Sequence, residues 1–172
     1  LPDCPRTKGA LLSWMHPRVS AIARCFLSLA QRTEDDVLAP AERLGVGFAL
    51  TRMLTDIPEH IAARKFPFPV DELERAGASV DEFLNGLPTP PVQKFIRGQA
   101  MWAMDLLDQG LPTTNRVGAR LARGLRAAAL RSRRLLIKTL DPARDPFRNP
   151  ARLGPGERWG CAIRAWFPIS AG

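Results

Sequence analysis

Three neighbouring side chains have the types and the spacing that suit a bound metal ion. Asp56 and His60 are four residues apart within the segment "ALTRMLTDIPEHIAARKFPFP" (49–69), so in a helix they share one face, with Glu59 beside them. Carboxylates are good ligands for hard cations such as Mg²⁺, whereas imidazole is a poor ligand for Mg²⁺. The segment therefore predicts either a working metal site or the remains of one.

Other arrangements that could perform chemistry are missing from the sequence. Its three cysteines are far apart and have no C-x-x-C or C-x-x-H spacing, so a structural zinc site is not expected. The histidines, His16 and His60, have no Ser or Cys partner at a spacing typical of a nucleophilic triad, and no glycine-rich phosphate loop occurs. Asp141 and Asp145 form the only D-x-x-x-D, and they enclose "PAR" in a proline-rich stretch, which argues against a helical metal motif.

Helices must position Asp56, Glu59 and His60, because apolar residues recur at three and four positions along most of the chain. The pattern predicts helices over about 17–32, 36–63, 70–76, 79–85, 90–109, 113–139 and 156–167. Pro17 is expected to open the first helix, and Ser79 and Glu82 form a capping box for the fourth. Gly45 and Gly47 are expected to let a neighbouring helix approach closely. No strand pattern appears, so the predicted fold class is all-α, and no apolar run is long enough to span a membrane.

Charge is distributed unevenly along the chain, which has a net charge of +8. Residues 1–109 carry 12 Lys/Arg against 14 Asp/Glu, whereas residues 110–172 carry 13 Lys/Arg against 3 Asp/Glu. This asymmetry predicts a polyanionic partner, namely RNA, an anionic lipid or an acidic protein surface; the alternative is a well-solvated basic helix. The expected apolar stripe of the 113–139 helix is Val117, Leu121, Leu125, Ala128 and Leu135. The candidate polyanion-binding residues are Arg120, Arg123, Arg126, Arg131, Arg133, Arg134 and Lys138.

The linked order of segments over roughly 36–167 resembles the second half of the squalene/phytoene synthase family. The residues that carry the resemblance are Leu44-Gly45, Leu50-Thr51, Asp56, Glu59, Lys65, Phe68-Pro69, Glu72-Leu73, Gly77, Ser79 and Phe83, then "LP" at 111–112, "DPF" at 145–147 and the closing "AIRAWF". The resemblance implies a truncated isoprenoid-synthase-like helical bundle. We expect a single domain, with residues 1–35 as an N-terminal segment of one helix and 36–172 as the family-like part with a basic end.

In the enzymes of this family, two Asp-rich motifs face each other and hold Mg²⁺ ions that bind a prenyl diphosphate. Asp56 and Glu59 match the second motif, but His60 stands where the resemblance expects its last Asp. Arg52 replaces an Asn and Thr55 an Arg of the family pattern, and the first motif is not found. We therefore expect a vestigial site with no catalytic residues, metal or cofactor, in which Arg52 neutralises Asp56 or Glu59 across one turn.

With its eroded motif, the chain is similar in character to the non-catalytic branch of this family that assembles mitochondrial complex I. The resemblance implies a pseudoenzyme that serves as a structural or assembly component of a large mitochondrial, respiratory-chain complex. Its partners would be protein subunits in the matrix or on the matrix side of the inner membrane, with cardiolipin or RNA contacts through residues 116–138. One alternative is an rRNA-binding accessory protein of a mitochondrial ribosome. Another is a prenyl-diphosphate transferase that a second chain completes.

Overall fold

The computed structural model describes residues 4–32 and 35–167, and within these ranges all regular structure is helical, which confirms the all-α prediction. In chain order the elements are α1 (Lys8–Leu29), α2 (Asp35–Thr55), α3 (Ile57–Ala62), α4 (Val70–Ala76), α5 (Val80–Leu84), α6 (Pro90–Gly110), the 3₁₀ helix η1 (Leu111–Asn115), α7 (Ala119–Thr139) and α8 (Pro155–Arg164). The predicted boundary at residue 35 adjoins residues 33–34, which lie outside the described residues. None of the described helices is long and apolar enough to cross a membrane.

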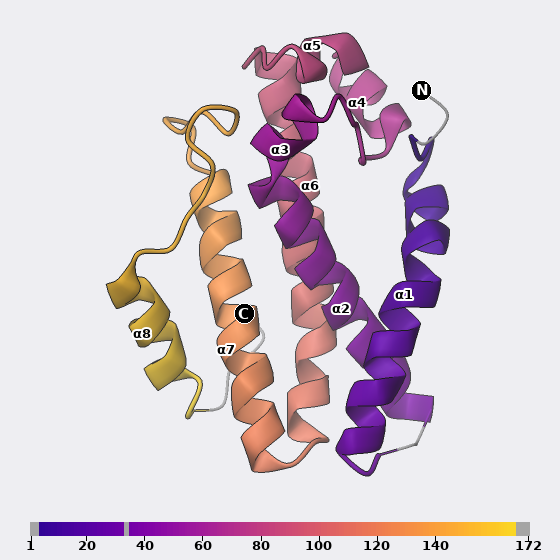
Figure 1. The fold of residues 1–172 in the computed structure, drawn as a ribbon, viewed down its shortest axis with the longest axis vertical. Helices are drawn as coiled ribbons and strands as arrows, with labels where there is room; N and C mark the ends of the chain where they lie inside the picture. Colours follow the sequence, from indigo (N-terminus) through magenta and orange to yellow (C-terminus); the bar gives the residue numbers. More distant parts are fainter. Residues whose placement is uncertain (1–3, 33–34, 168–172) are drawn as a thin grey trace.

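Helices α2 and α6 form the centre of the bundle, with α1 on one side and α7 on the other (Figure 1). Glycines allow this close packing. A Cβ atom added to Gly47 would lie 2.9 Å from Leu107 Cγ, and one added to Gly110 would lie 2.5 Å from the backbone nitrogen of Leu44. Gly45 lies equally close to α1, because a Cβ atom added there would lie 2.8 Å from Val19 Cγ1. The prediction that Gly45 and Gly47 admit neighbouring helices is therefore confirmed.

The core is built on the apolar face of α6, whose apolar residues at helical spacing are all buried: Val92, Phe95, Ile96, Ala100, Ala103 and Leu107. At the end of the bundle where α3, α4 and α5 lie, phenylalanine rings pack mostly edge to face, with centroids 5.0–6.3 Å apart: Phe66, Phe68, Phe83, Phe95 and Phe147. Edge-to-face contacts of this kind stabilise a core beyond simple burial. Leu11 and Met15 of α1 belong to the same buried cluster.

The first two helices differ from their predicted boundaries. The first helix begins at Lys8, where the Thr7 hydroxyl caps it by accepting from Ala10 N at 3.1 Å. Pro17 lies inside this helix on its exposed side, where water can satisfy the carbonyl that proline leaves unpaired. The predicted 36–63 helix is divided at Asp56, because Pro58 cannot donate a backbone hydrogen bond and instead sits in the first turn of α3.

The basic helix also differs from its prediction. Pro112 lies in η1, and α7 begins only at Ala119 after Gly118. The predicted stripe of Leu121, Leu125, Ala128 and Leu135 is only half-buried. The buried residues of α7 are Ala122, Ala129, Ser132 and Leu136, and three of them lie one position after a predicted residue. Val117, the other predicted member, is buried but lies before the helix begins. The Ser79 capping box is confirmed, whereas α4 begins after Pro69 and has no side-chain cap.

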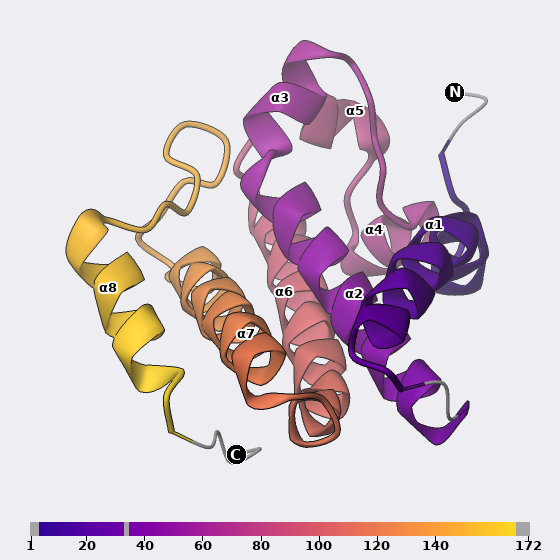
Figure 2. The same cartoon turned by 60° about the horizontal axis from the view of Figure 1, so that its bottom comes forward.

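Helix α8 packs against α7 at the outer edge of the molecule, as both Figure 1 and Figure 2 show. Its attachment depends on Glu157, which accepts hydrogen bonds from Lys138 Nζ at 2.6 Å, from Arg134 Nε at 3.4 Å and from the backbone N–H of Gly154 at 2.9 Å. Ala165, just after the helix, is buried. One carboxylate on α8 therefore joins two cations of α7 to the start of its own helix.

Candidate functional site

Asp56 lies at the junction of α2 and α3, and it is paired with a cation of its own chain. Arg52, in the last turn of α2, donates from Nε to Asp56 Oδ2. This hydrogen bond, reinforced by the charge of Asp56, raises the pKa of Arg52 above its ordinary value. The prediction that Arg52 neutralises Asp56 or Glu59 across one turn is therefore confirmed for Asp56.

The other two candidate ligands face different surroundings. Glu59 is exposed, whereas His60 is half-buried, and its ring packs edge to face on Phe68 with centroids 6.3 Å apart. The covered Nε2 atom of His60 has no hydrogen-bond partner among the described residues. Burial lowers the pKa of His60 below its ordinary value, although the carboxylates of Asp56 and Glu59 oppose the shift. We expect a neutral imidazole at neutral pH, held by packing on Phe68 and by a hydrogen bond to the backbone of Met53.

These three residues do not fit a magnesium ion. Mg²⁺ requires near-octahedral oxygen coordination, usually from carboxylates together with water and substrate phosphate. Here the Asp56 carboxylate is paired with Arg52, and the Glu59 carboxylate faces solvent. The third side chain, His60, is a partly covered imidazole. Across residues 4–32 and 35–167, no group of three or more His, Cys, Asp or Glu side chains is arranged to hold a metal ion.

Asp141 and Asp145 act as local turn residues. Asp141 Oδ1 accepts from the backbone N–H of Ala143 at 3.0 Å, and Asp145 Oδ1 accepts from that of Phe147 at 2.9 Å. Both bonds span two residues, as in Asx turns. The two aspartates therefore shape the loop after α7 and form no helical motif.

The predicted polyanion-binding residues are largely engaged within the fold. Arg133 donates to Asp108 of α6 at 2.7 Å, and Arg134 and Lys138 bind Glu157 of α8. Burial raises the pKa of Asp108 above its ordinary value, and Arg133 opposes that shift. These three cations join α7 to its neighbours on both sides.

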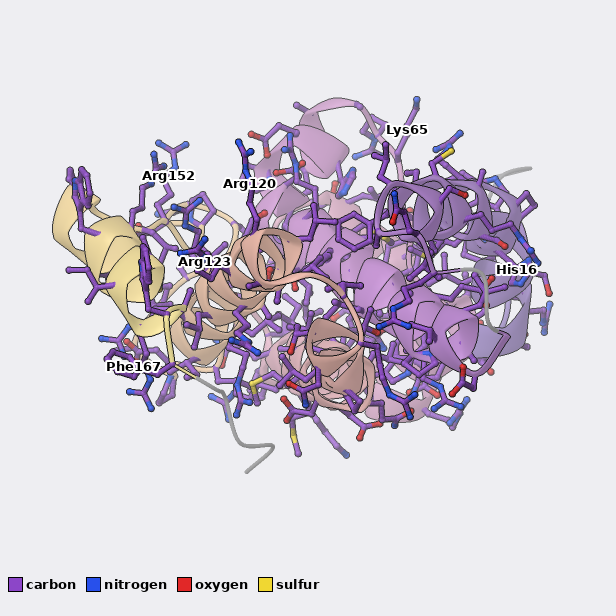
Figure 3. All side chains as sticks on the ribbon, turned by 90° about the horizontal axis from the view of Figure 1, so that it is seen from below. His16, Lys65, Arg120, Arg123, Arg152 and Phe167 are labelled. Atoms are coloured by element: carbon purple, nitrogen blue, oxygen red, sulfur yellow. The ribbon has the colours of Figure 1, made fainter. Side chains whose placement is uncertain are left out.

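The remaining four candidates lie elsewhere on α7. Arg126 donates to Asn115 Oδ1 of η1 at 3.4 Å, and the guanidinium of Arg123 lies 4.2 Å from the ring centroid of Trp166. Arg120 and Arg131 are exposed to solvent. Figure 3 labels Arg120 and Arg123, both of which lie on α7. Polyanion binding by these residues stays a prediction, and Arg120 and Arg131 are the best placed of them to meet such a partner.

Sequence reasoning did not single out Glu157 or the aromatic residues around α8. Glu157 is the only acidic residue between 146 and 172, and this signal could have indicated its role as a partner for the basic helix. Three of the four tryptophans, Trp14, Trp159 and Trp166, are exposed, while Trp102 is half-buried. The spacing of Trp159, Ile163 and Trp166 could have indicated that they share one helix face.

Comparison with known proteins first defines the class of fold. The chain is similar to the crystal structure of squalene synthase HpnC from Alicyclobacillus acidocaldarius, with a TM-score of 0.75 and 22% sequence identity. The similarity covers 86% of this chain and 55% of that protein, so the chain spans about half the length of this relative. It therefore has the all-helical, isoprenoid-synthase-like fold.

The family follows from the sequence. The squalene/phytoene synthase family model matches residues 3–155, and the chain belongs to this family. The match begins before the predicted 36–167 and ends sooner, so it includes α1 and stops where α8 begins. No curated protein sequence matches the chain.

Proposed function

We propose that this chain is a non-catalytic member of the squalene/phytoene synthase family that acts by binding other proteins. The observation that carries the proposal is the Arg52–Asp56 ion pair. Asp56 is the carboxylate that best matches the Asp-rich motif, and the arginine takes the place that a metal ion would need. The neutral, partly covered His60 beside it adds no oxygen ligand. Exposed apolar residues on α1, namely Trp14, Ile22 and Leu29, support a role in protein contacts.

The decisive test is the binding of a prenyl diphosphate to the 172-residue chain, measured by calorimetry with and without Mg²⁺. We expect no Mg²⁺-dependent binding, and we expect Asp56→Ala to change neither the heat signal nor the stability appreciably. Asp71→Ala is the matched control, because Asp71 is also paired with an arginine one turn away, Arg75, at 2.8 Å, and is similarly exposed. Mg²⁺-dependent binding that Asp56→Ala abolishes and Asp71→Ala preserves would refute the proposal and favour an enzyme that a second chain completes.

The finer part of the proposal is that the chain assembles a mitochondrial, complex I-type respiratory complex on the matrix side of the inner membrane. Its support is the resemblance to the non-catalytic branch of the family. The test is a native pull-down in mild detergent, followed by mass spectrometry and repeated after nuclease treatment. Respiratory-chain subunits that survive nuclease are the expected result. Ribosomal proteins that disappear with nuclease would favour rRNA binding instead.

A further inference from the structure

Helix α8 turns its apolar side away from the protein. Trp159 and Ile163 are 72% and 62% exposed, and Trp166 and Phe167, in the turn that follows, are exposed as well. On the side that meets α7 lie Glu157, half-buried Cys161 and buried Ala165. Soluble proteins usually place the apolar face of an amphipathic helix against the core. The reversed orientation leaves an apolar surface of two indole rings, one phenyl ring and one branched aliphatic side chain.

Cations border this surface on several sides. Arg131 of α7 and Arg158 of α8 line an open cleft of about 370 Å³ together with Trp159. Arg164 is exposed at the end of α8, and Arg123 stacks on Trp166. Figure 3 shows Arg152 and Phe167 on this side of the molecule, far from His16. The only acidic residue of α8 is Glu157, whose carboxylate is already bound to α7.

We propose that α8 and the following Trp166-Phe167 turn are a docking surface for an anionic lipid bilayer. The apolar side chains would enter the boundary between headgroups and acyl chains, where tryptophan is favoured. Arg131 and Arg158 would meet lipid phosphates at the cleft beside Trp159, because guanidinium groups bind phosphate well. The ten residues of α8 span about 15 Å, half of what a bilayer crossing needs, so the helix would lie in the membrane plane.

Charge argues for a lipid surface over a second copy of this chain. Two copies that met through this face would bring like charges together around Arg131, Arg158 and Arg164, which opposes association. An anionic bilayer offers both an apolar interior and many phosphates to the same face. The family match ends at residue 155, so α8 lies beyond the matched region. The inference does not depend on whether the chain is catalytic.

The test is co-sedimentation of the 172-residue chain with vesicles of phosphatidylcholine alone, or of phosphatidylcholine and phosphatidylglycerol in equal parts. We expect strong binding only to the anionic vesicles, weakened by salt and accompanied by a shift of tryptophan emission to shorter wavelength. Ile163→Asp should lower the partition coefficient about tenfold or more, because it removes an aliphatic side chain that would enter the bilayer and adds a charge that anionic lipids repel. Arg158→Gln should lower the coefficient about fivefold, the effect expected for one arginine near the surface.

The matched control is Ile22→Asp on α1, where the original side chain is 65% exposed. This control makes the same substitution at an equally exposed position, and it should leave vesicle binding unchanged. Circular dichroism should show that both variants keep their helices. Equal binding to neutral and anionic vesicles, or an Ile22→Asp loss as large as that of Ile163→Asp, would overturn the proposal. So would a dimer, detected by sedimentation without lipid, that Ile163→Asp abolishes.

Discussion

The close crossing of α2 and α6 gives a sharp test of the fold, through the substitution Gly110→Ala. A Cβ atom at this position would lie 2.5 Å from Leu44 N and 2.6 Å from Leu44 Cα. These are backbone atoms, so no side-chain rotation removes the clash, and the helices must separate by about 1 Å to restore ordinary contact. The backbone at Gly110 has φ −87° and ψ −19°, which alanine adopts freely, so the cost comes from packing alone.

Overpacking of this kind costs about 1–3 kcal/mol, against which alanine recovers up to about 1 kcal/mol of helix propensity. The matched control is Gly98→Ala in the same helix, where an added Cβ atom has no neighbour within 4 Å. This control should be stabilised by up to about 1 kcal/mol. The two variants should therefore differ by roughly 2 kcal/mol in their free energy of unfolding, or about 4–8 °C in Tm for a chain of this size.

Urea unfolding followed by far-ultraviolet circular dichroism measures this difference directly. The two variants should have the same slope of free energy against urea concentration, because neither changes the surface exposed on unfolding. If Gly110→Ala proved as stable as Gly98→Ala, helices α2 and α6 would not be in the close contact described here. The account of the glycines as packing residues would then be refuted.

Three further predictions concern the packing around α7, the core and α8. Hydrogen bonds from Lys138, Gly154 and Arg134 lower the pKa of Glu157 to about 2, so the stability from this group is complete above pH 4.5 and is lost as the pH falls towards 2. Glu157→Gln should therefore remove this acid dependence from the attachment of α8, as followed by tryptophan fluorescence. Arg133→Met should destabilise the fold by about 1 kcal/mol in urea, since it leaves Asp108 partly buried without a cation. Phe68→Ala should cost about 3–5 kcal/mol, whereas Phe167→Ala, at an exposed position, should leave the unfolding midpoint nearly unchanged.

Local sequence pattern was sufficient to predict the helical fold class and the contacts between residues close together in the chain. The 3.6-residue period predicted that long helices form the chain, because a helix that packs on a core repeats its apolar residues every turn, although several helix ends were wrong. The Ser79 capping box and the Arg52–Asp56 pair were also predictable, since their partners lie three or four residues apart. The departures at Arg52 and His60 predict a site unsuited to Mg²⁺, which the calorimetric test would check.

Only the tertiary structure determined which acidic residues pair with the arginines of α7. Arg133 meets Asp108 from 25 positions away, and Arg134 meets Glu157 from 23, and no local pattern indicates such partners. The buried stripe of α7 shifted by one residue because two neighbouring helices, rather than the periodicity alone, determine which side is covered. Likewise, the sequence of α8 determined that the helix has an apolar face. Only the tertiary structure shows that this face points outward, because the opposite side of the helix carries Glu157, which meets Arg134 and Lys138 of α7.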